Sequence, residues 1–196
     1  PKPSSAASDV YKRQAEGAVV EYLYDGAGRL VQQIAYSAKT TATIKATTTF
    51  ESIRPAAASA DINDYKIYNN LGRLVGTIDG EGYLTELVYD ASGNLTTKIR
   101  YATSLTGANN PIRNTLIFTP DLAKMRPASS PQDQVWTYSY TRLDKVSSER
   151  NAEGTLTLYV YDDMGRLTST VKAAGTSTSR SVLSRYDVQG LSLIHI

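Results

Sequence analysis

Acidic side chains recur at fixed positions along this chain, and paired carboxylates can act as a general acid and a general base. Three aspartates each follow a tyrosine directly and stand three residues before a glycine: Asp25, Asp90 and Asp162. Three glutamates each stand directly before a glycine: Glu16, Glu81 and Glu153. Because these carboxylates are separated by tens of residues, each in its own copy of a local pattern, they do not form one constellation. We interpret them as turn residues and expect no catalytic residue, no metal site and no cofactor.

Both ends of the chain resemble translated sequencing-library adapters. Residues 191–196, LSLIHI, are what the mosaic end of a transposase-based library encodes, and residues 4–14, SSAASDVYKRQ, resemble one reading frame of the matching forward adapter. We therefore expect residues 1–14 and 191–196 to be adapter-derived and not native. Residues 15–190 are then the natural part, cut from a longer reading frame.

This division changes what charge and composition imply. The chain has 21 basic and 19 acidic residues, of which the first 14 residues hold three basic and one acidic, so 18 of each sign remain. With equal numbers of basic and acidic residues, residues 15–190 lack the excess positive charge that favours binding to nucleic acid. We therefore expect no nucleic-acid partner. The single histidine, His195, lies in the second adapter, and the chain has no cysteine. These absences exclude histidine- or thiol-dependent catalysis, disulfides and iron–sulfur clusters from residues 15–190. No apolar run approaches the roughly twenty residues of a membrane span.

A fifteen-residue pattern occurs three times without a gap, beginning at Glu16, Glu81 and Glu153. More degenerate copies begin at Tyr65 and Tyr138, and a truncated copy covers residues 183–190. Tyrosine, aspartate, glycine, arginine and leucine recur in it at fixed spacing. The motif residues to which we assign structural roles are Tyr22, Tyr24, Asp25, Gly28, Arg29, Leu30, Tyr68, Gly72, Arg73, Leu74, Tyr89, Asp90, Gly93, Leu95, Tyr159, Tyr161, Asp162, Gly165, Arg166 and Leu167.

Side chains alternate with a period of two inside each copy, which indicates β-strands rather than helices. The segment YDGAGRL predicts a type I turn, in which the aspartate accepts backbone hydrogen bonds and the glycine takes a left-handed conformation that closes a bulged hairpin. The arginine after the glycine is expected to stack on a neighbouring tyrosine. We expect hairpins near residues 16–36, 65–101 and 138–172.

A longer period of 72 residues relates Arg54 and Pro55 to Arg126 and Pro127, so the larger unit is a pair of hairpins plus a connection. Residues 37–64 and 102–134 are expected to be long loops, in which Thr115 to Phe118 could add a short strand. The predicted fold class is all-β, with repeated antiparallel β-hairpins forming one twisted, curving sheet as a fragment of a larger shell or solenoid.

The spacing of Tyr, Asp, Gly, Arg and Leu over residues 15–190 resembles the YD repeat of bacterial Rhs proteins, of the C component of insecticidal toxin complexes, and of teneurins. The resemblance implies a shell of successive hairpins that encloses a toxic C-terminal segment in the bacterial members. It also implies a secreted or cell-surface location, with neighbouring repeats of the full-length chain and an enclosed toxin as partners. The chain departs from the pattern at Asn69, Asn94, Thr141 and Asp144.

The favoured function is a non-catalytic structural module of a large Rhs-type protein. The alternative is a binding module that recognises glycan or protein through exposed tyrosine and arginine side chains. An enzyme, such as a glycosidase, would need two carboxyl groups within about 5–10 Å of each other in one pocket.

Overall fold

The computed structural model describes residues 10–13, 17–40, 49–105, 121–187, 190 and 192–195. Within this part of the chain there are thirteen strands, which follow one another in the sheet in chain order, and two short helical turns. The prediction of an all-β fold of antiparallel hairpins in one sheet is therefore confirmed. The proposed strand at Thr115 to Phe118 lies outside the described residues. The strands are β1 (Val10–Arg13), β2 (Val19–Tyr24), β3 (Leu30–Ala35), β4 (Ile62–Tyr68), β5 (Leu74–Ile78), β6 (Leu84–Tyr89), β7 (Leu95–Arg100), β8 (Gln134–Tyr140), β9 (Val146–Arg150), β10 (Leu156–Tyr161), β11 (Leu167–Lys172), β12 (Arg180–Tyr186) and β13 (Ser192–His195).

The hairpin turns have the geometry that the repeated motif predicts. In the β2–β3 turn, the Gly28 N–H donates to the Asp25 carbonyl at 2.9 Å, and Gly28 has a φ of +76°. The strand register shifts immediately before the motif tyrosine in the four hairpins β2–β3, β4–β5, β8–β9 and β10–β11. Such a shift is the β-bulge that a left-handed glycine allows. Asp144, which replaces the glycine in the β8–β9 turn, also has a positive φ, of +55°.

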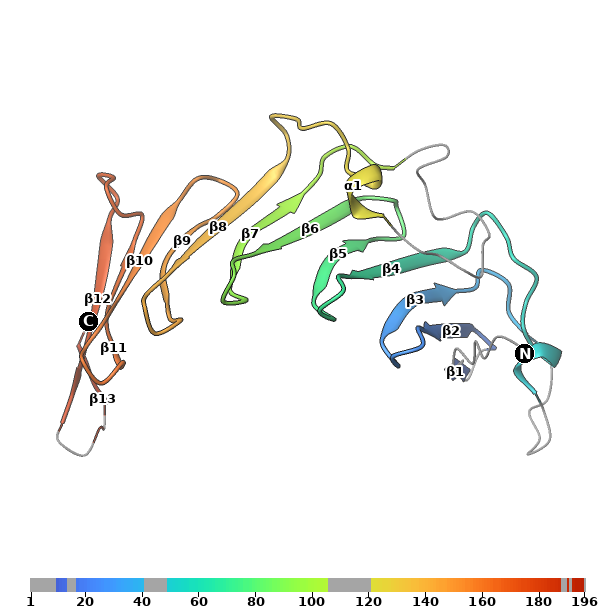
Figure 1. Ribbon diagram of the computed structural model, residues 1–196, viewed down its shortest axis with the longest axis horizontal. Coiled ribbons are helices and arrows are strands. Elements are labelled where there is room, and N and C mark those ends of the chain that lie inside the picture. Colours follow the sequence, from blue (N-terminus) through green and yellow to red (C-terminus); the bar gives the residue numbers. More distant parts are fainter. Residues whose placement is uncertain are drawn as a thin grey trace. The chain divides into compact units, whose positions relative to one another are not determined.

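The chain divides into two compact units, and the first contains residues 1–85 and 101–130. It holds β1 to β5, the start of β6 and both helical turns, η1 (Phe50–Ser52) and α1 (Leu122–Met125). Figure 1 labels these strands and α1. Residues on β2 alternate between buried and half-buried, so one face of that strand is covered. The buried apolar side chains of this unit are Val19, Leu23, Phe50, Ile53, Tyr65, Ile67, Ile78, Leu84, Tyr101, Leu105 and Met125. Five of these come from the two connections, which therefore supply part of the core.

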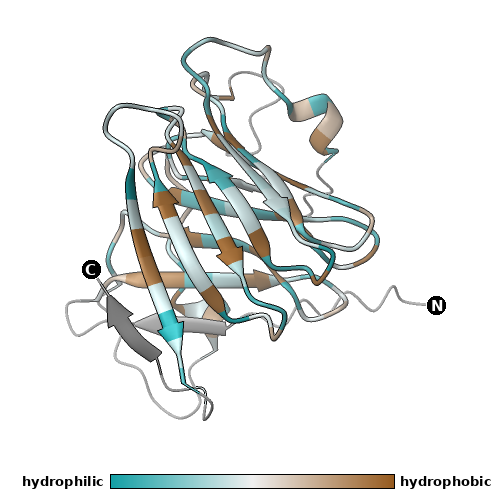
Figure 2. Cartoon of the chain, turned by 90° about the vertical axis from the view of Figure 1, so that its left-hand side faces the viewer, coloured by the Kyte–Doolittle hydropathy of each residue, from teal (hydrophilic) through white to brown (hydrophobic). Residues whose placement is uncertain are grey.

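The second unit contains residues 86–100 and 131–196, with β7 to β13 and the rest of β6. Short turns join β8 through β12, and no helical turn is present among its described residues. None of its described apolar side chains is fully buried, and Val160 on β10 is 50% exposed. Figure 2 shows hydrophobic and hydrophilic residues interspersed along its strands. The difference between the two units follows from the connections, because strands joined only by short turns receive no cover from a loop.

Candidate functional site

The motif aspartate acts as a turn cap. Asp25 Oδ1 accepts the backbone N–H groups of Ala27 and Arg29, both at 2.9 Å, and Asp25 Oδ2 accepts Arg29 Nε at 2.7 Å. Asp162 repeats the arrangement with Met164 N, Arg166 N and Arg166 Nε at 3.1, 2.8 and 2.7 Å. Both carboxylate oxygens are thereby engaged within the turn.

The pKa values of these carboxyls support the capping role. The hydrogen bond from the Arg166 backbone N–H lowers the pKa of Asp162 below its ordinary value of 3.8, and the backbone N–H of Asn94 does the same for the pKa of Asp90. For Asp25, partial burial acts to raise the pKa, but the hydrogen bonds from Arg29 outweigh it and the pKa is lowered. A carboxyl with a lowered pKa is ionised at neutral pH and is a poor general acid.

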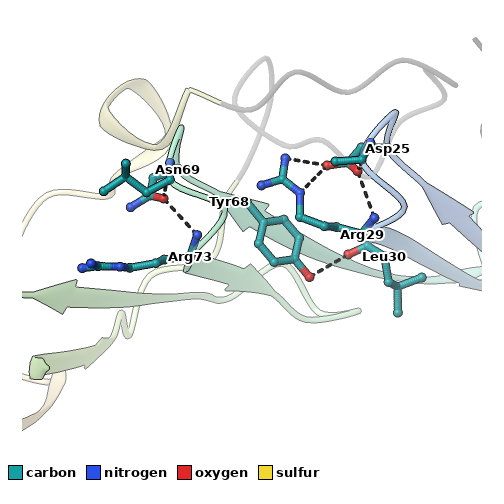
Figure 3. A network of polar contacts seen from close by, with 8 residues as sticks. Asp25, Arg29, Leu30, Tyr68, Asn69 and Arg73 are labelled. Atoms are coloured by element: carbon teal, nitrogen blue, oxygen red, sulfur yellow. Dashed lines mark hydrogen bonds and ion pairs between the residues drawn. The ribbon is translucent and has the colours of Figure 1, made fainter. Parts of the chain in front are cut away.

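The β2–β3 turn also contacts the strand of the hairpin that follows it. The Arg29 guanidinium lies over the ring of Tyr68 on β4, with 4.8 Å from Cζ to the ring centroid, and the Tyr68 hydroxyl donates to the Leu30 carbonyl at 3.1 Å (Figure 3). We call this pair of contacts a latch: a turn cation stacked on the next motif tyrosine, whose hydroxyl binds the carbonyl that follows the cation. The latch explains why arginine and tyrosine recur together.

Latches recur along the chain with substitutions that keep one or both contacts. Arg166 stacks on Tyr186 at 4.8 Å, and the Tyr186 hydroxyl donates to the Leu167 carbonyl at 2.8 Å. Lys145 lies 5.5 Å from the Tyr161 ring centroid, and the Tyr161 hydroxyl donates to the Val146 carbonyl at 2.8 Å. The hydroxyl contact is therefore common to these latches, whereas the cation varies.

The departures from the motif are compatible with this geometry. Thr141 replaces the aspartate, and its hydroxyl accepts the backbone N–H groups of Leu143 and Lys145 at 3.2 and 3.3 Å. Asn69 Oδ1 accepts the N–H groups of Leu71 and Arg73, both at 3.0 Å (Figure 3). Asn94 replaces the arginine and donates to Asp90 Oδ2 at 3.3 Å and to Asp144 Oδ1 at 2.8 Å. Any short acceptor at the aspartate position can cap the turn.

The remaining predicted motif residues have clear places. Leu30, Leu74, Leu95 and Leu167 each begin a return strand. The motif glycines all have positive φ: Gly28, Gly72, Gly93 and Gly165. Tyr22, Tyr24, Tyr89 and Tyr159 lie on outgoing strands, and the Tyr159 hydroxyl donates to Glu149 at 3.3 Å. The structure does not bring the recurrent aspartates together, and among the described residues no group of three acidic or histidine side chains could hold a metal ion.

One polar cluster was not predicted from the sequence: Glu21, Tyr36 and Arg54. Glu21 on β2 is fully buried, and its carboxylate accepts from the Tyr36 hydroxyl and from Arg54 Nη2. The Arg54 guanidinium also lies over the Phe50 ring at 4.7 Å. Burial and the neighbouring Glu21 carboxylate raise the pKa of Tyr36, so this hydroxyl remains a donor. The Glu21 side chain has no exposed surface, whereas the Arg54 side chain is partly exposed.

A cavity of about 290 Å³ lies over strands β3, β4 and β5 of the first unit. Its polar lining includes Gln32, Asp64, Lys66 and Asp79. The Gln32 amide donates to Asn63 and to the Tyr65 hydroxyl at 3.0 and 3.2 Å, and burial raises the pKa of Tyr65 to about 12. The lining lacks a pair of carboxyls of which one is buried, so the cavity does not have the features expected of a glycosidase centre.

The geometry defines a class: an all-β repeat protein whose hairpins are joined in series by turn-to-strand contacts. Within that class, residues 68–106 and 142–177 match the RHS repeat family model. These segments are RHS repeats, and the resemblance to the RHS family is confirmed. No curated protein matches the chain.

Solved structures show the same fold. The crystal structure of TcdB2-TccC3 without its hypervariable C-terminal region matches with a TM-score of 0.58 at 15% identity, covering 91% of this chain and 7% of that chain. The Photorhabdus luminescens Tc holotoxin pore, with a substitution in TccC3, matches with a TM-score of 0.59 at 16% identity, covering 92% and 8% respectively. The chain therefore spans less than a tenth of these proteins, and at such identities the likeness concerns the fold alone.

We expect the hydroxyl contact of a latch to be a measurable source of stability. Tyr140 donates to the Leu95 carbonyl at 2.8 Å, whereas Tyr138, two residues away on β8, makes no latch. Tyr140→Phe keeps the ring but leaves that carbonyl without its donor, so it should cost about 1 kcal/mol in urea unfolding. Tyr138→Phe is the matched control and should cost less. Equal costs would show that the latch hydroxyl has no particular role.

Proposed function

We propose that this chain is a non-catalytic structural module in the wall of a larger RHS-repeat protein. The observation that carries the proposal is the latch, because it joins consecutive hairpins through the most regular residues of the motif. The polar groups of these residues are stacked or hydrogen-bonded within the latch. An isolated hairpin is marginally stable in water, so contacts of this kind are what a long series of hairpins needs. The motif carboxylates accept the hydrogen bonds that cap the turns, which supports a role without catalysis.

The proposal extends to partners and location. The neighbouring repeats of a longer chain would be the direct partners, and the wall would enclose or present a toxin or effector segment, as the resemblance to the RHS family implies. A protein of that kind would be secreted or displayed at the cell surface. No helix among the described residues is long and apolar enough to cross a membrane.

The test is to recover the longer reading frame that contains residues 15–190 from the same DNA and to image the purified product by electron microscopy. We expect a closed particle with an internal cavity, and a segment that resists protease until the particle is opened with denaturant. An extended particle, or a compact one without a cavity, would overturn the proposal. Saccharide binding lost on Tyr22→Ala or Tyr159→Ala would instead support a glycan-binding module.

A further inference from the structure

The two long connections carry the same short motif at the same place in the 72-residue period. Each has an apolar residue, two variable residues, a second apolar residue and then Arg-Pro, at residues 50–55 and 122–127. Both form a helical turn: the Arg54 N–H donates to the Phe50 carbonyl at 2.8 Å, and the Arg126 N–H donates to the Leu122 carbonyl at 3.1 Å. We call residues 50–55 and 122–127 the first and second clip.

The apolar residues of each clip are packed onto the sheet of the first unit. Phe50 and Ile53 form a buried cluster with Val19 of β2, and Tyr36 packs against it. In the second clip Met125 is buried, and Leu122 lies so close to β5 that a Cβ on Gly76 would stand 3.2 Å from Leu122 Cδ1. Clips are therefore parts of the connections that cover the sheet.

The β2–β3 hairpin, which precedes the first clip, has polar side chains that bind the clip. The Glu21 carboxylate receives the Arg54 guanidinium, and the Tyr36 hydroxyl binds the other carboxylate oxygen. Backbone bonds from Tyr36 N to Val19 O and from Thr40 N to Gly17 O, at 3.0 and 2.9 Å, lead the connection back over β2. At the other end of the connection, Asp61 accepts from Ser37 N and Ala58 N, both at 2.8 Å, which closes the loop.

The same residue types stand at the corresponding positions of the second repeat, where both Glu86 and Tyr101 are buried. The Tyr101 N–H donates to the Leu84 carbonyl and the Leu105 N–H donates to the Gly82 carbonyl, at 3.0 and 2.9 Å, which repeats the backbone path of the first connection. The third full copy is different. Leu158 stands in the glutamate position, Ala173 in the tyrosine position, and the connection after β11 is a short turn without Arg-Pro.

We propose that the buried Glu21 and the half-buried Tyr36 form a docking site for an arginine-bearing clip, and that leucine at the glutamate position marks a hairpin without one. The ligand of this site is a single helical turn with two apolar side chains three residues apart, followed by arginine. An isolated carboxylate would be costly to bury on a sheet face, so the glutamate has a place there only when an arginine covers it. The residue three positions before the motif tyrosine thus decides whether the following connection lies on the sheet.

Hydrogen exchange on the whole chain tests this docking. Glu21→Leu, which copies the third hairpin, leaves the Arg54 guanidinium without its carboxylate, so the Ile53 and Arg54 amides should exchange at least about tenfold faster. The amides of β10 and β11 should be unchanged and report that the chain remains folded. Glu51→Leu, an exposed change inside the clip, is the matched control and should leave exchange as in the unmodified chain.

Two further variants keep the proposal falsifiable if Glu21→Leu disturbs the whole chain. Glu21→Gln preserves size but removes the charge and leaves one acceptor oxygen in place of two, and it should speed exchange within residues 49–61 only. Glu21→Leu combined with Arg54→Leu should restore protection, because an apolar clip then meets an apolar face. Unchanged exchange in Glu21→Gln, or equal acceleration in Glu51→Leu, would overturn the docking site.

Discussion

Replacing Arg54 by leucine is expected to lower the free energy of unfolding by about 3 kcal/mol, the lower end of the cost of breaking a buried ion pair. Glu21 is fully buried, whereas the Arg54 side chain is 28% exposed, so the loss falls mainly on the carboxylate. After the substitution, Glu21 keeps the hydrogen bond from Tyr36 but loses its counter-charge. The measurement is urea unfolding followed by the fluorescence of the tyrosines and of Trp136.

The double variant Glu21→Leu with Arg54→Leu should recover most of that loss. Replacing both members of a buried ion pair by apolar residues is often neutral or stabilising, and Leu158 occupies the glutamate position in this same chain. Lys124 and Asp121 provide a matched control, because their 3.2 Å ion pair is largely exposed. Lys124→Leu should leave stability unchanged within error. If Arg54→Leu behaves like Lys124→Leu, the buried pair is not a source of stability.

The hairpins and their turns could be predicted because the residues that determine them are close in sequence. The aspartate, the glycine and the arginine of a turn lie within five residues, and the structure joins them directly, as in Asp162, Gly165 and Arg166. Even the departures follow local rules, since Thr141 can still accept the two backbone hydrogen bonds. The tyrosine of each latch was harder to predict from the sequence, because it is distant along the chain. Tyr68, for example, lies 38 residues from the carbonyl that it binds.

The buried glutamate could not be predicted from alternation alone. The sequence of β2 presents Val20, Tyr22 and Tyr24 on one face, which reads as the more apolar side. The structure buries the other face, with Val19, Glu21 and Leu23, because Phe50 and Ile53 of the connection after β3 cover it. The signal was nevertheless present, since Glu21 and Glu86 stand at the same place before the motif tyrosine and the Arg-Pro pairs recur with the larger period.

The helical turns of the clips were also missed, for a physical reason. A single turn has too few residues to show a helical period, and short isolated helices are not stable by themselves. Both turns are held by tertiary packing of Phe50, Ile53, Leu122 and Met125. Composition rich in alanine, threonine and proline predicted loops at residues 37–64 and 102–134, but it gave no sign that parts of them pack on the sheet.

A pair of glycines tests whether the first connection truly lies against β2. Gly17 and Gly154 occupy equivalent positions in the motif, and both have a φ of +81°. A Cβ on Gly17 would stand 2.5 Å from the Thr40 carbonyl oxygen, whereas a Cβ on Gly154 would meet no heavy atom within 4 Å. Alanine at either position carries the same backbone strain, but only at Gly17 does it also push the connection away.

We therefore expect Gly154→Ala to cost about 1–2 kcal/mol, the usual penalty for a left-handed residue with a side chain. Gly17→Ala should cost more, by on the order of 1–3 kcal/mol, because a backbone atom rather than a flexible side chain must move. The Thr40 amide gives a local readout, since it donates to the Gly17 carbonyl at 2.9 Å and should exchange faster in Gly17→Ala alone. Equal costs of the two substitutions, with an unchanged exchange rate of the Thr40 amide, would mean that the connection can move away from Gly17 without loss of stability. The clip, rather than the close approach at Gly17, would then hold the connection on the sheet.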